Sequence, residues 1–142
     1  MELDIPNRDG WVTGALAELP PCPPFPEFTD FEQRALDSIA ALFDAHEDAF
    51  RGQIAAARVV DRINTIVGFY TRVIVDRSKC QPLNIRAKGG HFDVEGIQHG
   101  MGVLIWEEDG YLDQIEGFTY SDNPLEGVDL AELKFIRSVQ LG

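Results

Sequence analysis

Residues 103–120 read Val-Leu-Ile-Trp-Glu-Glu-Asp-Gly-Tyr-Leu-Asp-Gln-Ile-Glu-Gly-Phe-Thr-Tyr. Two runs rich in β-branched and aromatic residues flank Asp109 and Gly110. An Asp-Gly pair between such runs strongly favours a two-residue hairpin turn, because both turn positions need a positive φ angle. The stretch therefore predicts two antiparallel strands joined at this turn.

The predicted turn also decides which side chains share a face of the hairpin. A two-residue loop places Trp106 opposite Asp113 and Leu104 opposite Ile115. One face then holds Leu104, Trp106, Tyr111 and Ile115, and the other holds Val103, Ile105, Leu112, Glu116, Phe118 and Tyr120. Both faces are partly apolar, so we expect a helix on one and either the N-terminal arm or a second copy of the chain on the other.

The rest of the chain predicts a small α+β protein. Thr29 followed by Glu32 has the spacing of a helix capping box, and an amphipathic stripe continues from Phe31 to His46. Stretches rich in β-formers predict strands over residues 58–75, with a turn near 64–68, and over 83–87, 91–97 and 135–141. We expect an N-terminal helix packed on a meandering antiparallel sheet of about five strands.

The prolines divide the chain into two parts. Five of them lie between positions 20 and 26, which forbids a helix or a central strand there. We therefore predict a Pro-rich N-terminal arm over residues 1–27 and a single α+β domain over residues 28–142.

Charge and composition exclude several classes of protein. The chain has 24 acidic and 12 basic side chains, a net charge of −12, which argues against binding to nucleic acid. No apolar run approaches the roughly 18 residues of a membrane helix, and the N-terminus lacks the apolar core of a signal peptide. We expect a cytoplasmic protein without membrane contact. No glycine pattern has the spacing of a nucleotide-binding loop, so no cofactor is predicted.

Glu116 is the side chain that stands out in the hairpin. A carboxylate among apolar neighbours is either buried with a partner, such as Arg72 or Arg86, or placed for acid–base or binding chemistry. A pocket between helix and sheet, centred on Glu116, would draw on the other polar and aromatic candidates: Tyr120, His99, Trp106 and Tyr70.

A second, weaker pattern concerns metal ions. His91, Asp93 and Glu95 alternate along a predicted strand, so they project from one face, and all three residue types bind metals. A half-exposed strand shows the same alternation, so both interpretations stay open.

Several motifs resemble a small family of uncharacterised bacterial proteins. Gly68-Phe69-Tyr70-Thr71, the segment from Gly96 to Gly102, and the run Glu116-Gly117-Phe118-Thr119-Tyr120 are similar to its Gly-Phe-Phe-Thr, Gly-Leu-x-His-Gly-Ala-Gly and Leu-Glu-Gly-Phe-Thr-Tyr motifs. This chain departs from the pattern at Tyr70 and at Met101. The resemblance covers roughly residues 55–122 and implies a fold and a bacterial origin, but no activity.

The sequence leaves three functional hypotheses. The first is a non-enzymatic, acidic module that binds a basic protein, such as an immunity-type protein that neutralises a basic toxin. The second is a ligand-binding or catalytic pocket centred on Glu116. The third is a homodimer with apposed sheet faces.

Overall fold

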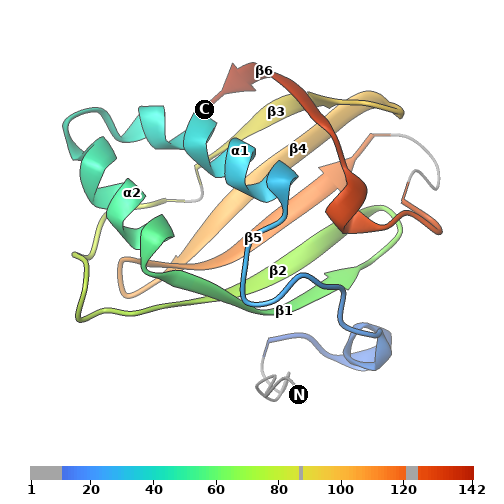
Figure 1. Cartoon of the computed structure of the whole chain (residues 1–142), viewed down its shortest axis with the longest axis horizontal. Coiled ribbons are helices and arrows are strands. Elements are labelled where there is room, and N and C mark those ends of the chain that lie inside the picture. The colour runs from blue at the N-terminus through green and yellow to red at the C-terminus, as the bar shows by residue number, and fades with distance from the viewer. Residues whose placement is uncertain (1–10, 87, 121–124) are drawn as a thin grey trace.

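The computed structural model describes residues 11–86, 88–120 and 125–142. It has the predicted α+β class: a helical segment over residues 30–55 lies across one face of a six-stranded antiparallel sheet (Figure 1). The strands are β1 (Ala57–Asn64), β2 (Gly68–Val75), β3 (Gly89–Val94), β4 (Ile97–Glu108), β5 (Tyr111–Thr119) and β6 (Phe135–Leu141). Their order, β1-β2-β5-β4-β3-β6, is not a simple meander, and the expected number of five strands was wrong.

The helical segment begins where the capping box predicts. The Thr29 side chain accepts from the Glu32 N–H, and the Glu32 carboxylate accepts from the Thr29 N–H, at the start of α1 (Asp30–Ile39). Asp44, at a φ of 51°, interrupts the 3-10 stretch η2 (Ala40–His46) before α2 (Glu47–Ala55) begins. The helices are not N-terminal, because the arm precedes them.

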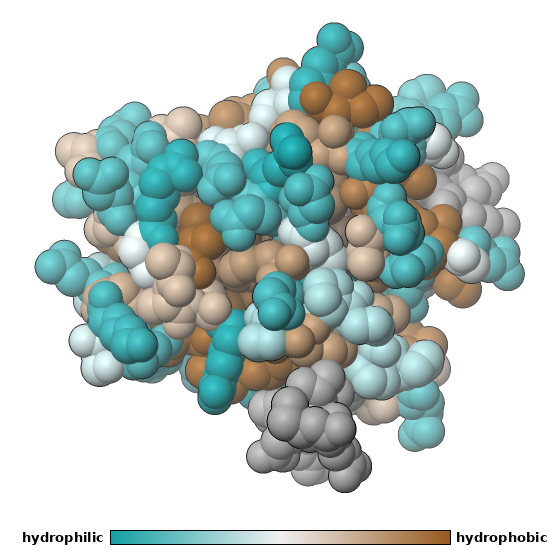
Figure 2. Space-filling view, viewed as in Figure 1, coloured by the Kyte–Doolittle hydropathy of each residue, from teal (hydrophilic) through white to brown (hydrophobic). Residues whose placement is uncertain are grey.

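The core lies between these helices and the sheet. Phe31 of α1 meets Phe69 of β2 and Phe92 of β3 edge to face, each with ring centroids 6.2 Å apart. Phe43 and Phe50 stack with centroids 4.2 Å apart. Figure 2 shows the solvent side of this layer, where hydrophilic side chains cover much of the helices. We call the sheet face under the helices the inner face and the opposite one the outer face.

The described part of the N-terminal arm is docked along the free edge of β1 (Figure 1). The Cys22 N–H donates to the Arg62 carbonyl, and the Val59 N–H donates to the Pro26 carbonyl, each over 2.7 Å. Before this contact lies the 3-10 turn η1 (Gly14–Glu18). An edge strand with unpaired backbone groups is prone to pair with other chains, so the arm protects β1 while satisfying its backbone.

A buried ion pair fastens the arm to the inner face. Arg62 is 0% exposed and its guanidinium lies 2.7 Å from the Glu32 carboxylate, which also accepts from the Thr71 hydroxyl. The same guanidinium donates to the carbonyls of Cys22 and Pro24, both at 2.8 Å. A single side chain therefore links arm, helix and sheet.

The C-terminal part of the chain forms the predicted final strand. The Asp129 side chain accepts from the Ala131 N–H and caps the short η3 (Leu130–Glu132), and β6 has the predicted bounds.

The strand expected over residues 83–87 was wrong for residues 83–86, which run without strand pairing; residue 87 lies outside the described residues. Instead, the Leu83 N–H donates to the Gly110 carbonyl and Ile85 is fully buried, so this segment anchors the hairpin turn.

Candidate functional site

The β4–β5 hairpin forms at the predicted turn, but its register changes after two residue pairs. Glu108 faces Tyr111 and Glu107 faces Leu112, as expected; beyond them Trp106 faces Gln114. Asp113 is the extra residue of a β-bulge, so the expected pairing of Trp106 with Asp113 was wrong. The bulge exchanges the faces of every residue that follows it in β5.

The bulge places Glu116 on the outer face. Its cross-strand neighbours are Tyr70 of β2 and Leu104 of β4, instead of the predicted Val103. Ile115, only 1% exposed, enters the core in its place. The predicted sharing of a face by Glu116 and Phe118 holds, because both follow the bulge.

Around Glu116 the outer face is hollowed. The hollow has a volume of about 390 Å³, and we call it the Glu116 pocket; its lining residues are Trp11, Val12, Thr13, Leu16, Tyr70, Trp106, Gln114 and Glu116. The arm supplies one wall and strands β2, β4 and β5 supply the floor. The pocket expected between helix and sheet is thus found on the other side of the sheet, because close-packed aromatic rings fill the helix side.

The walls of the Glu116 pocket are held by specific contacts. The Trp11 indole N–H donates to the Gln114 side-chain oxygen over 2.7 Å, which ties the arm to β5. The Arg72 guanidinium lies 5.9 Å from the centroid of the Trp11 ring, at a cation–π distance. Trp106 is 41% exposed and leaves its ring accessible.

The Glu116 side chain is half-buried. Within residues 11–86, 88–120 and 125–142 no hydrogen bond or ion pair joins its carboxylate to another group, so the expected pairing with Arg72 or Arg86 is not seen. A half-buried carboxylate without a protein partner keeps its capacity to bind a cation or a hydrogen-bond donor.

Tyr120 belongs to a different part of the outer face. Its hydroxyl lies 3.2 Å from Nδ1 of His91, and its ring packs edge-on against Phe118. Beside this pair is a smaller hollow of about 230 Å³, over β3 and β4. Among the predicted pocket residues, the structure therefore unites Glu116 with Tyr70 and Trp106, and separates Tyr120 from them.

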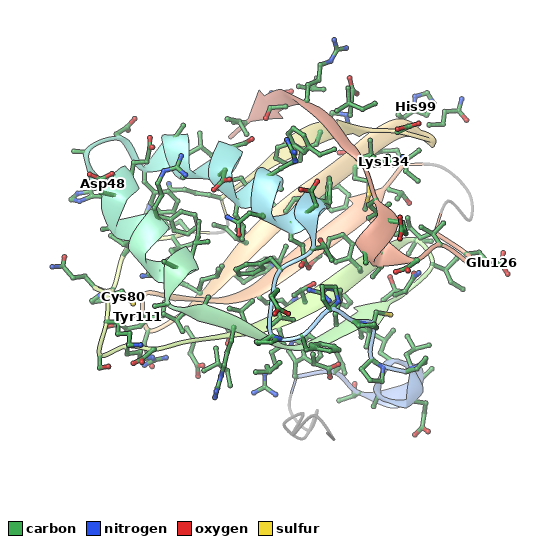
Figure 3. The ribbon with its side chains drawn as sticks, in the orientation of Figure 1. Asp48, Cys80, His99, Tyr111, Glu126 and Lys134 are labelled. Carbon is green, nitrogen blue, oxygen red and sulfur yellow. The ribbon has the colours of Figure 1, made fainter. Side chains whose placement is uncertain are left out.

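His99 lies apart from both hollows. Figure 3 shows it at the end of the sheet opposite to Tyr111, where β4 begins. It is exposed and has a φ of 67°, followed by Gly100 at 68°, so this part of β4 is irregular. His99 cannot act together with Glu116 in this arrangement.

The three metal candidates of β3 do not converge. His91 contacts Tyr120, and the Asp93 carboxylate lies 2.7 Å from Nε of Arg137. Glu95 is exposed in the turn after β3. No group of three potential metal ligands is found among the described residues.

Five residues that line the Glu116 pocket were not predicted: Gln114 of β5 and the arm residues Trp11, Val12, Thr13 and Leu16. Leu112 and Ile115 are both apolar and three positions apart, a spacing that breaks the strand alternation and signals the bulge that brings Gln114 outward. For Trp11 the sequence offers no comparable signal, because its place depends on how the arm folds back.

The tip of the hairpin is acidic. Glu107 and Glu108 are exposed, and Asp109 pairs with Arg77 at 3.2 Å. Burial, followed by the nearby Glu108 charge, raises the pKa of Asp113 above its usual value. Arg72 and Arg77 act on the same carboxyl in the opposite direction, so burial is the main cause of the shift.

No protein-family model, curated protein or solved structure matches this chain. The resemblance to the bacterial family therefore stays a prediction. In the described part of the chain, no helix has the length and apolar character needed to span a membrane.

Proposed function

We propose that this protein is a non-enzymatic module that binds a basic segment of another protein through the outer face of its sheet. The observation that carries the proposal is the combination of exposed aromatic rings on this face with nearby acids that have no ion-pair partner among the described residues. Trp106 and Tyr120 are 41% and 52% exposed. Glu108 shares this face with Trp106, and Glu116 lies beside Trp106 in the hollow. Glu107, opposite Leu112, adds an exposed acid at the tip of the same hairpin.

Charge supports a basic partner over a second copy of the chain. With a net charge of −12, two copies repel each other, whereas a cationic partner is attracted over a distance that shortens as salt is added. Exposed tryptophan and tyrosine are the side chains that most often anchor protein interfaces. Neutralisation of a basic toxin, as by an immunity-type protein, is the role that this combination favours.

A display library of random peptides tests the proposal without assuming a particular partner. We expect selection on the immobilised protein to enrich peptides that combine lysine or arginine with apolar residues. A variant carrying Glu107→Lys and Glu108→Lys should bind the enriched peptides at least about tenfold more weakly, because like charges now meet across the interface.

The matched control carries Glu126→Lys and Glu132→Lys, which change the net charge equally at exposed positions near η3. It should retain most of the peptide affinity. Equal losses of peptide affinity in both variants would mean that the effect comes from the overall charge and not from the hairpin tip. Enrichment of neutral peptides would refute the proposal. If light scattering shows a stable dimer that Trp106→Asp dissociates, the outer face serves self-association, and the proposal of a basic partner is wrong.

A further inference from the structure

The Glu116 pocket has the composition of a site for a positively charged group. Its aromatic members, Trp11, Tyr70 and Trp106, come from the arm and from two different strands, and they surround one carboxylate. Aromatic faces carry negative electrostatic potential and bind ammonium and guanidinium groups at up to about 2 kcal/mol when water is excluded. We propose that this pocket binds an organic cation, with Glu116 as its counter-ion and the three rings as its walls.

The free carboxylate is the first argument for a cation. The half-buried Asp93 has an arginine 2.7 Å away, whereas Glu116 has no such partner among the described residues. Tyr70, its cross-strand neighbour, is also half-buried and makes no hydrogen bond within the described ranges. Tyr70 and Glu116 thus both line the hollow with hydrogen-bonding capacity that no other described residue uses.

The second argument is the balance of charge around the pocket. Three carboxylates, Asp61, Asp113 and Glu116, lie on or next to this part of the sheet, and the guanidinium groups of Arg72 and Arg77 both act on Asp113. Arg72 is the cross-strand neighbour of Asp61, and its guanidinium lies 5.9 Å from the centroid of the Trp11 ring. Arg72 faces Asp61 and Arg77 pairs with Asp109, whereas Glu116 has neither as an ion-pair partner within the described residues. The Trp11 wall already holds one guanidinium by the same cation–π contact.

Size limits what the pocket accepts. About 390 Å³ lies near the lower end of the volumes of small-molecule sites, roughly 300–1,000 Å³. It is large enough for an alkylammonium or guanidinium group on a short apolar stem. That cation is either a free small molecule or the lysine or arginine side chain of a bound segment. The latter source rests on the proposed function, whereas the pocket chemistry does not.

Both tryptophans of the chain line the pocket, so a small ligand that enters it should change the tryptophan fluorescence. We would titrate the protein with two pairs of probes that differ only in charge: N-acetylarginine amide against N-acetylcitrulline amide, and choline against 3,3-dimethylbutanol. Each cation should bind at least about tenfold more tightly than its neutral counterpart, because a charged hydrogen bond and cation–π contacts act together.

Glu116→Gln keeps the shape of the side chain and should abolish the preference for the cation. Glu107→Gln, which removes a carboxylate outside the pocket, should preserve it. Equal binding of charged and neutral probes, no binding of either, or a preference that survives Glu116→Gln would each overturn the inference. The wild-type comparison of probes decides the question even if a variant does not fold.

A last experiment distinguishes the two sources of the cation. A peptide with one arginine flanked by apolar residues should bind more tightly than the capped arginine if the natural ligand is a protein segment. Equal affinities assign the site to a free small cation. Because the probes are single residues, the pocket is tested even where the peptide selection fails, and the two proposals can fail separately.

Discussion

One glutamate lies on each side of the sheet, Glu32 of helix α1 on the inner side and Glu116 of β5 on the outer face, and the two carboxylates have opposite surroundings. Glu32, on the inner side, is 1% exposed and bonded to Arg62, Thr71 and the backbone of Thr29. Glu116, on the outer face, is half-buried in a hollow and has no partner within the described residues.

The difference shows which charge stabilises the fold and which is available for binding. Burial of an ion costs several kcal/mol unless its charge and hydrogen-bonding capacity are satisfied, so Glu32 persists only because the pairing is complete. Glu116 avoids that cost by keeping contact with the open hollow. The closed ion pair on the inner side therefore contributes to the fold, and the open carboxylate on the outer face is the one that we propose for binding.

The largest expected effect comes from breaking the closed pair. Arg62→Met removes the charge that neutralises Glu32 and leaves the Cys22 and Pro24 carbonyls without their donor. We expect the free energy of unfolding to fall by about 3–5 kcal/mol, measured by urea titration.

Glu116→Gln is the matched change on the open face and should alter the free energy of unfolding by less than about 0.5 kcal/mol. The comparison fails if both substitutions have the same effect. A loss below about 1 kcal/mol for Arg62→Met would show that the inner pair contributes little to the fold.

Two glycines, one on each face of the sheet, test whether the inner face is packed more tightly than the outer one. A Cβ atom at Gly117 would lie 2.1 Å from the Phe69 ring, which is 2% exposed and enclosed by the core. A Cβ at Gly102 would also lie 2.1 Å from a ring, that of Phe118, but this ring is half-buried on the outer face.

Gly117→Ala should therefore lower the free energy of unfolding by about 1–3 kcal/mol, because an enclosed ring has little room to move. Gly102→Ala should cost less than about 1 kcal/mol, since Phe118 can turn toward solvent. Thermal unfolding of the two variants under identical conditions measures the difference. A larger loss for Gly102→Ala would mean that the outer face is packed as tightly as the inner one.

Local signals predicted the elements of the fold better than they predicted its site. The capping box, the Asp-Gly turn and the final strand depend on neighbouring residues, and each was confirmed. The strand order depends on contacts between distant segments, which no local pattern records. Arg62 was also missed as a core residue, because its burial requires Glu32 and the arm carbonyls together.

The error in predicting the site came from a single residue, the bulge residue Asp113. Sequence reasoning placed Tyr70, Trp106 and Glu116 among the pocket candidates, but an uninterrupted alternation put Glu116 opposite Val103. The bulge at Asp113 moves Glu116 to the face where the arm lies, and the arm then supplies Trp11. A shift of one residue in register exchanges the two faces of a strand, so small local errors change the site completely.

The smallest expected effect concerns that bulge. The pKa of Asp113 is raised by burial and by Glu108, so the folded protein holds this proton to a higher pH than the unfolded chain does. Stability therefore falls as the pH rises from the ordinary carboxyl range, near about 3.9, through the raised value. Asp113→Asn should be more stable than the wild type at neutral pH by only a few tenths of a kcal/mol, because the carboxyl is still partly hydrated.

Asp76 supplies the control of opposite sign. Hydrogen bonds from Ser78 lower its pKa, so its charged form stabilises the fold at neutral pH and this contribution disappears as the pH falls through the lowered value. Asp76→Asn should therefore destabilise the protein at neutral pH, where Asp113→Asn stabilises it. Urea titrations of both variants at neutral and acidic pH test the signs. If Asp113→Asn destabilises the protein at neutral pH, the attraction of Arg72 and Arg77 outweighs the burial of this carboxylate, and Asp113 belongs with the paired carboxylates such as Glu32 and not with the open one at Glu116.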